Sequence, residues 1–185
     1  LKNGIKLSTN LKQSLQNGLT TIVYNFVDML SHSKTEMEMI KELASNDKAY
    51  RSLTFSWFIN SPLFEIIKSA SEYGFKLIIT TDHGTINVKN PTKIIGDRNT
   101  SQNLRYKTGR SLTCNEKDNL IFNNPHEILL PKTSLNSSYV FAKEDFYLVY
   151  PNNYNHYSNY YKNTYQHGGV SMEEMIIPFI VLNPK

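Results

Sequence analysis

Residues 75–84 read FKLIITTDHG, and this stretch decides which fold class the sequence predicts. Residues 75–81 are mostly apolar or β-branched, which is typical of a strand buried on both faces, as strands of parallel sheets are. The strand is followed at once by Asp82-His83-Gly84. Since ligands of open α/β sheets bind beyond the carboxyl ends of strands, Asp82 and His83 are candidate site residues.

A similar stretch lies upstream. Residues 21–27, TIVYNFV, are almost wholly apolar, and Asp28 follows their carboxyl end. Together with the first stretch they predict two buried strands. Helices are expected at residues 8–18, 35–45 and 47–73. The order of strand, helices and strand predicts an α/β fold with parallel strands.

The longest helical stretch contains signals for a break and for an end. Asn60-Ser61-Pro62 is predicted to end one helix and to start the next, because proline is well tolerated at a first helical position. Tyr73-Gly74 is predicted to close the second helix.

The sequence after Gly84 is less regular. Short strands are expected at residues 86–90, at residues 119–123, and once or twice within residues 139–150. The Asn- and Tyr-rich residues 151–166 are interpreted as a surface loop. Near the end, Ser171 and Glu174 have the spacing of a capping box around one helical turn. Residues 176–182 predict a last strand, at a sheet edge because of Pro178.

Composition limits the class of protein. The chain has 185 residues, a formal net charge of +4 and a single cysteine, Cys114, so no disulfide can form within it. The charge suits anionic substrates and is small for a dedicated DNA-binding domain. We expect a cytoplasmic origin, since no disulfide is available and no stretch approaches the apolar length of a membrane span. The first residue, Leu1, suggests a piece of a longer protein.

The candidate metal ligands are three of the histidines and the aspartates near them in the sequence. Asp28 and His32 are spaced D-x-x-x-H, Asp82 and His83 are adjacent, and His167 precedes a glycine pair. Zinc takes nitrogen from His and oxygen from Asp, and catalytic sites leave one position open. Asp28, His32 and His167 would form one three-ligand site, and Asp82 with His83 would form part of a second. Two such sites ~3.5–4 Å apart can hold the attacking and leaving oxygens of a phosphoryl transfer.

Each of these features also has a purely structural interpretation. Asp28 could cap the helix that follows it. Asp82-His83-Gly84 could form a tight turn with glycine at positive φ. His167 could be an ordinary loop residue. The ordered combination favours the metal site, because two of the three motifs follow predicted buried strands.

A basic segment lies in the middle of the chain. Its cations could contact phosphate on a surface, or they could simply face water in a solvated loop. The candidates for substrate binding are Arg98, Arg105, Lys107 and Arg110. The tyrosines of residues 154–165 could stack on bases or pack structurally. His126, His156 and Cys114 are interpreted as structural or exposed.

The order D-x-x-x-H, T-D-H-G, H-G-G-x-S-x-E-E resembles the alkaline phosphatase superfamily. Four stretches are similar to PglZ-type domains, and among these to the C-terminal effector domains of PorX-type response regulators, which act with the type IX secretion system. The resemblance covers most of residues 20–185. The stretches are YNFVDMLSHSK (24–34), TTDHGT (80–85), GDRNTSQNLRYKTGR (96–110) and QHGGVSMEEMIIP (166–178).

The resemblance implies an alkaline-phosphatase-like α/β sheet flanked by helices, with residues 86–165 as a less regular insert. It also implies two zinc ions and a phosphohydrolase that acts on phosphodiesters of nucleotide type. In the superfamily the second metal also takes an early Asp and a nucleophilic Thr or Ser. Residues 1–27 contain no acidic residue. We therefore expect a C-terminal portion of the domain that lacks the first strand and the nucleophile segment and is inactive in isolation.

The resemblance implies signalling proteins of a two-component or secretion system as partners. Two other functions stay open. One is a non-catalytic module of the same fold that binds zinc or a nucleotide to regulate a protein partner. The other is a nucleic-acid-binding protein that uses residues 98–110, which the modest charge disfavours. A sheet edge left open by a missing strand would favour a homodimer.

Overall fold

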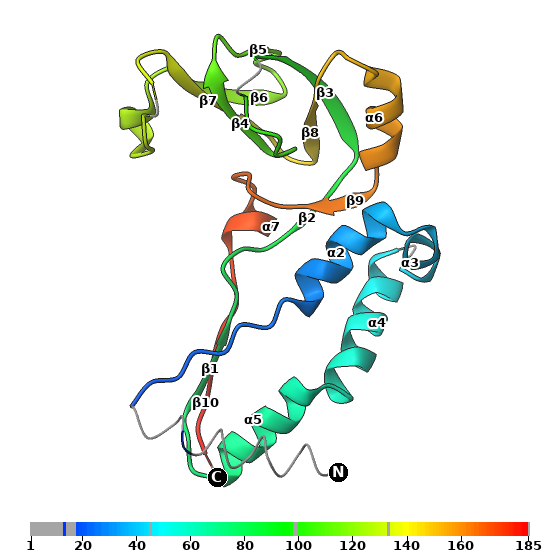
Figure 1. The fold of residues 1–185 in the computed structure, drawn as a ribbon, viewed down its shortest axis with the longest axis vertical. Coiled ribbons are helices and arrows are strands. Elements are labelled where there is room, and N and C mark those ends of the chain that lie inside the picture. Colours follow the sequence, from blue (N-terminus) through cyan, green and yellow to red (C-terminus); the bar gives the residue numbers. More distant parts are fainter. Residues whose placement is uncertain (1–12, 14–17, 45, 98–99, 133, 185) are drawn as a thin grey trace. The chain divides into compact units, whose positions relative to one another are not determined.

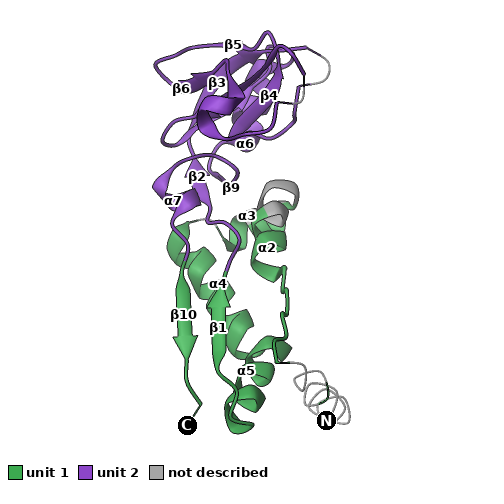
Figure 2. Ribbon diagram, turned by 90° about the vertical axis from the view of Figure 1, so that its left-hand side faces the viewer, with its two compact units in different colours: residues 1–80, 178–185 green, residues 81–177 purple. Residues whose placement is uncertain are grey.

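The computed structural model describes residues 13, 18–44, 46–97, 100–132 and 134–184, apart from the side chains of residues 32–36, 38 and 41. These residues form two compact units (Figure 2). Unit 1 is Leu1–Thr80 with Pro178–Lys185, and unit 2 is Thr81–Ile177. Within the described residues, no helix is both long enough and apolar enough to cross a membrane.

Unit 1 contains helices and a two-stranded antiparallel sheet (Figure 1). The strands pair from Leu77 opposite Leu182 to Thr80 opposite Phe179. The elements of unit 1 are α2 (Phe26–Glu36), α3 (Glu38–Leu43), α4 (Asp47–Ile59), α5 (Pro62–Glu72), β1 (Leu77–Thr80) and β10 (Phe179–Leu182).

The predicted helix boundaries at the middle of unit 1 are confirmed. Helix α4 ends at Ile59, and Ser61 caps α5 by accepting a hydrogen bond from the N–H of Phe64 at 3.2 Å. Pro62 is the first residue of α5. Gly74 follows the helix with a φ of 78°, which a residue with a side chain rarely adopts. Local sequence therefore fixes these ends.

The predicted strand at residues 21–27 is wrong. Residues 18–25 have no regular secondary structure, and α2 begins at Phe26. Val23 is 79% exposed, and the described part of the chain provides no strand that pairs with these residues. An apolar run becomes a strand only where a neighbour takes up its backbone hydrogen bonds. Asp28 consequently lies in the first turn of a helix, not after a strand.

The predicted strand at residues 75–81 is confirmed as β1, but its expected parallel pairing is wrong. Its partner β10 runs antiparallel to it. The burial of its side chains alternates, so it is not buried on both faces. The helix expected at residues 35–45 is divided, since α2 ends at Glu36 and α3 begins at Glu38. The helix expected at residues 8–18 falls almost wholly outside the described residues.

Unit 2 is mainly β structure. Its sheets have the strand orders β2–β9, β5–β3–β8 and β4–β7–β6, and β3 and β8 run parallel. Its elements are β2 (Ile86–Val88), β3 (Asn90–Ile95), β4 (Tyr106–Arg110), β5 (Thr113–Cys114), β6 (Asn119–Phe122), the 3₁₀ helix η2 (Pro125–Ile128), β7 (Ser137–Ala142), β8 (Phe146–Val149), α6 (Tyr154–Tyr161), β9 (Thr164–Gln166) and α7 (Met172–Met175).

The strands of unit 2 bury two apolar clusters. One gathers Ile86 and Val88 of β2 with Tyr147 and Val149 of β8. The other is made by Ile94, Val140, Ala142 and Leu148. Because alternate residues of β8 belong to different clusters, this strand connects the two halves of the core. The short strands expected at residues 86–90, 119–123 and 139–150 are confirmed as β2, β6, β7 and β8.

The interpretation of residues 151–166 as a loop is wrong, since α6 and β9 lie there. Tyr154 and Tyr161 at the ends of α6 pack on the cluster around Tyr147, and the hydroxyl of Tyr154 donates to the carbonyl oxygen of Pro91 at 3.2 Å. Asn and Tyr have modest helix propensity, and packing against the core outweighs it. The described residues thus form an α/β protein whose sheets are accompanied by helices.

Candidate metal centre

Two of the predicted ligands meet in unit 2. The rings of His83 and His167 stack with their centroids 3.8 Å apart and their planes at 9°. His83 lies in the loop before β2, and His167 lies in the loop after β9. These strands pair with Ile86 opposite Gln166, so the two loops leave the same end of one small sheet. Ligand nitrogens of the two rings lie within 4.8 Å of each other.

The ring of His83 has a defined orientation. Its Nδ1 lies 3.0 Å from the carbonyl oxygen of Gly84. A carbonyl oxygen only accepts hydrogen bonds, so a neutral His83 carries its proton on Nδ1. Its Nε2 then presents a lone pair, which is the state a metal ligand requires.

Asp82 lies beside this nitrogen. Its Oδ1 is 3.7 Å from Nε2 of His83 and accepts a hydrogen bond from the N–H of His83 at 3.0 Å. The side chain is 86% exposed. Hydrogen bonding from its own backbone N–H, and then the nearby His83 ring, lower the pKa of the Asp82 carboxyl below its ordinary value. Asp82 is therefore an ionised oxygen donor at neutral pH.

The donor set fits zinc. The imidazoles of His83 and His167 stack in unit 2, and the carboxylate of Asp82 lies beside His83. Nitrogen with oxygen ligands is the combination that zinc accepts in catalytic sites. The surroundings of His83 fit as well, because a backbone carbonyl holds its Nδ1 and leaves its Nε2 available to a metal.

The other two predicted ligands belong to unit 1. Asp28 is half-buried in the first turn of α2, near the hydroxyl of Tyr50. That hydroxyl bonds to Ser31 at 2.7 Å and to the carbonyl oxygen of Val27 at 3.2 Å. His32 lies one turn further along α2, and its side chain is outside the described part of the structure. The metal-ligand roles of Asp28 and His32 stay predictions.

Two cations of the basic segment are buried, whereas the sequence predicted that the segment lies on the surface. Arg105 is fully buried, with 0% of its side chain exposed, and pairs with Glu174. Lys107 is 1% exposed, and its Nζ lies 4.5 Å from the centroid of the Tyr150 ring. Burial lowers the pKa of Lys107 to about 8. The expected surface location is therefore wrong for Arg105 and Lys107.

The two remaining cations of the segment differ from each other. Arg110 ends β4 and is exposed. Arg98 falls outside the described residues. Contact of these two arginines with a substrate stays a prediction.

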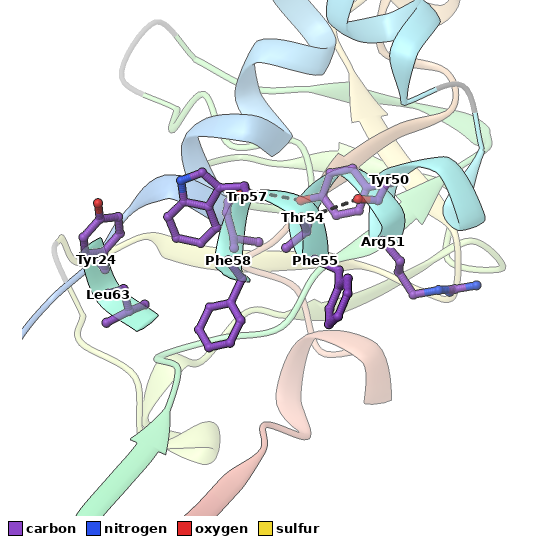
Figure 3. A pocket seen from close by; sticks show the side chains of 9 residues that line it. Tyr24, Tyr50, Arg51, Thr54, Phe55, Trp57, Phe58 and Leu63 are labelled. Atoms are coloured by element: carbon purple, nitrogen blue, oxygen red, sulfur yellow. Dashed lines mark hydrogen bonds between the residues drawn. The ribbon is translucent and has the colours of Figure 1, made fainter. Parts of the chain in front are cut away.

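Unit 1 contains a groove of about 400 Å³ (Figure 3). Trp57 stacks on Phe26 with centroids 3.9 Å apart, and Phe55, which also lines the groove, is 65% exposed. No sequence motif singles out this groove, although the run Thr54–Ile59 is rich in aromatic residues. Its lining residues are Tyr24, Val27, Tyr50, Arg51, Thr54, Phe55, Trp57, Phe58 and Leu63.

Comparison with known proteins gives one family. The family model described as the BREX system PglZ alkaline phosphatase-like domain matches residues 5–182. The match extends over both units and reaches the last residue of β10, Leu182. No curated protein matches the chain.

Proposed function

Because the chain belongs to the PglZ family of alkaline phosphatase-like domains, we propose that it provides the metal-binding residues of a phosphohydrolase acting on nucleotide-type phosphodiesters. Membership of this family indicates phosphohydrolase-type chemistry. The observation that carries the metal-binding part is the stacked pair His83 and His167, with Nε2 of His83 facing away from its backbone partner.

The proposed ligands are five side chains of this chain. Asp82 and His83 serve one zinc ion, and Asp28, His32 and His167 serve the other, as the resemblance implies. Bound zinc supplies positive charge that stabilises the oxygens of a transferring phosphoryl group. Asp82 enters this site already ionised, so it can bind a cation without first losing a proton.

The substrate class rests on charge. Arg110 is exposed at the end of β4, and an arginine forms paired hydrogen bonds with a phosphate. We propose that Arg110 and Arg98 contact the phosphate of the substrate. The net charge of +4 suits an anionic ligand such as a phosphodiester.

Zinc titration tests the metal-binding part. Chelator-treated wild-type protein, His83→Ala and His167→Ala are titrated with zinc in a calorimeter, and bound zinc is counted by elemental analysis. His126→Ala is the matched control, because His126 is exposed in η2 and no ligand role is assigned to it. We expect affinity to fall by at least about 100-fold in the first two variants and to stay unchanged in the control. Equal zinc binding in all four proteins contradicts the proposal.

A second experiment separates hydrolase from binding module. A fluorescent thymidine dinucleotide and thymidine monophosphate are compared by anisotropy with and without zinc, and both are then followed by chromatography. Zinc-dependent cleavage of the dinucleotide that is lost in His167→Ala supports the phosphodiesterase. Zinc-dependent binding without cleavage is expected both of the non-catalytic module and of a hydrolase whose nucleophile this chain does not supply. The same comparison on a longer protein that includes the nucleophile then decides, and binding without cleavage there favours the non-catalytic module.

The same proposal includes a biological setting that rests on sequence resemblance. We place the chain in the cytoplasm, as the output domain of a PorX-type response regulator, with signalling proteins as partners and a homodimer as the expected assembly. Asp82→Ala tests this role, since Asp82 is exposed and its loss leaves the core untouched. Signalling that survives Asp82→Ala argues against an output through the metal site.

A further inference from the structure

One residue connects the two histidine loops of unit 2. Glu174, in α7, accepts a hydrogen bond on its backbone carbonyl oxygen from the N–H of Gly84 at 2.9 Å, directly after His83. Its Oε1 accepts a second one from the N–H of Gly169 at 2.9 Å, two residues beyond His167. Strands β2 and β9 and helix α7 accordingly lie together in Figure 1. Glu174 therefore holds one loop through its backbone and the other through its side chain.

Arg105 fixes the carboxylate of Glu174. Its Nε donates to Oε1 and its Nη2 donates to Oε2, each at 2.9 Å. Its Nη1 donates to the carbonyl oxygen of Phe146. The two side chains are 0% and 2% exposed, so no solvent competes for these bonds. The planar guanidinium sets the plane of the carboxylate, and Oε2 can then also accept the N–H of Ser171 at 3.1 Å.

The pKa of Glu174 agrees with this arrangement. Burial alone would raise the pKa of its carboxyl. The hydrogen bonds and charge of Arg105, with the hydrogen bonds from Ser171 and Gly169, outweigh burial and hold the pKa below its ordinary value. The carboxylate is thus charged, and both of its oxygens accept hydrogen bonds.

Asn103 holds the His167 loop at a second point. Its Nδ2 donates to the carbonyl oxygen of His167 at 3.2 Å, and its Oδ1 accepts the N–H groups of Arg105 at 2.7 Å and Tyr106 at 3.2 Å. Gly168 has a φ of 99°, and a Cβ there would lie 2.9 Å from Nδ2 of Asn103. The loop can approach Asn103 this closely because residue 168 has no side chain.

We infer that Glu174, Arg105 and Asn103 are positioning residues that align His83 and His167 for metal binding, a role that rests on the proposed function. They act on the histidines through the backbone of the two loops. Ordering two free loops at the moment of binding would cost conformational entropy, and the preformed connection avoids that cost. Loss of the connection should weaken zinc binding by about 10- to 100-fold, although every ligand is still present.

The main test compares two neighbouring glutamates. Glu174→Gln removes the charge at the connection, and Glu173→Gln is the matched control, because Glu173 lies on the same turn and is exposed. We expect zinc affinity to fall by about 10- to 100-fold in Glu174→Gln only. Long-range ¹H–¹⁵N NMR spectra of the metal-free protein report the ring nitrogens of His83 and His167, and they should change only in this variant. A folded Glu174→Gln protein with wild-type affinity overturns the inference.

Asn103→Asp keeps the test valid if Glu174→Gln does not fold. This change retains an oxygen for the N–H groups of Arg105 and Tyr106 and replaces the donor to His167 with a carboxylate oxygen that cannot donate. We expect about tenfold weaker zinc binding at an unchanged unfolding temperature. Unchanged affinity and unchanged histidine spectra contradict the inference.

The outcome for His167→Ala distinguishes failure of the proposed function from failure of the positioning role. If that variant binds zinc as the wild type does, the proposed function fails. If it loses zinc while Glu174→Gln and Asn103→Asp keep wild-type affinity, only the positioning role fails.

Discussion

His83 and His167 lie face to face with their ring centroids 3.8 Å apart, although 83 positions of the sequence, from 84 to 166, separate them. Each histidine precedes a glycine, Gly84 or Gly168, and both loops rest against neighbours with little space to spare. The absence of a Cβ at these positions is what lets the two loops come together.

Gly84→Ala should disrupt the centre. A Cβ at this position would overlap the backbone carbonyl oxygen of Glu173, which cannot move aside as the end of a flexible side chain can. The hydrogen bond from the N–H of residue 84 to Glu174 would then lengthen or break. We expect zinc affinity to fall by at least about tenfold, measured by calorimetric titration. Gly74→Ala serves as a control because open space surrounds Gly74, although its φ of 78° gives the variant a stability cost of its own.

Arg105 and Glu174 should be strongly coupled in stability. Arg105→Met leaves the Glu174 carboxylate buried without its cation, which should cost about 3–5 kcal/mol in the free energy of unfolding. The double variant Arg105→Met with Glu174→Gln removes both charges and should lose less than the sum of the single changes. Urea unfolding of the wild type and the three variants measures the coupling. Additive losses would show that the two side chains do not depend on each other.

Lys107→Met should stabilise unit 2 at neutral pH. Burial lowers the pKa of Lys107 from 10.5 to about 8, so below pH 8 the folded protein holds a desolvated charge. Between pH 8 and 10.5 the unfolded chain binds this proton and the folded protein does not. The stability contribution of Lys107 is therefore lowest below pH 8 and rises with pH through that window.

The expected gain for Lys107→Met at pH 7 is about 1–3 kcal/mol in the free energy of unfolding, and its pH dependence between pH 8 and 10.5 should flatten. Lys93→Met is the matched control, since the Nζ of Lys93 also lies over a tyrosine ring, 4.8 Å from the centroid of Tyr154, but Lys93 is exposed. A Lys107→Met protein that unfolds at lower urea concentration than the wild type contradicts the prediction.

Cys114 should react slowly with alkylating reagents. Burial, followed by the charges of Glu116 and Asp118, raises the pKa of its thiol to about 11. The thiolate is the reactive form, so at pH 8 alkylation by iodoacetamide should be at least about tenfold slower than in the unfolded chain. Mass spectrometry with and without urea measures both rates. Equal rates would mean that the thiol is not shielded in the folded protein.

Features with local causes could be predicted from the sequence. Ser61 and Pro62 form the boundary between α4 and α5 because a cap and a fixed φ act within one helical turn. Ser171 and Glu174 form the predicted capping box for the same reason. The histidines singled out as ligands, His83 and His167, also come together.

Features that depend on distant partners could not be predicted. The direction of β1 is set by β10, and the burial of Arg105 is set by Glu174, 69 positions away. The capping box identified Glu174 as a local cap, and its link to Gly84 depends on how the two loops pack. Helix α6 forms because Tyr154 and Tyr161 pack against the core. Composition alone does not reveal this packing.

The pairing of β1 with β10 has a consequence for folding kinetics. The hydroxyl of Thr80 donates to the carbonyl oxygen of Pro178 at 2.8 Å across 98 positions of sequence, and the whole of unit 2 lies between them. Closing so long a loop in an unfolded chain is slow, because its entropic cost precedes any contact. A folded unit 2 shortens the effective loop by holding Gly84 beside Glu174 near its two ends. The sheet of unit 1 should therefore form late, and the residues that align the histidines also guide the last step of folding.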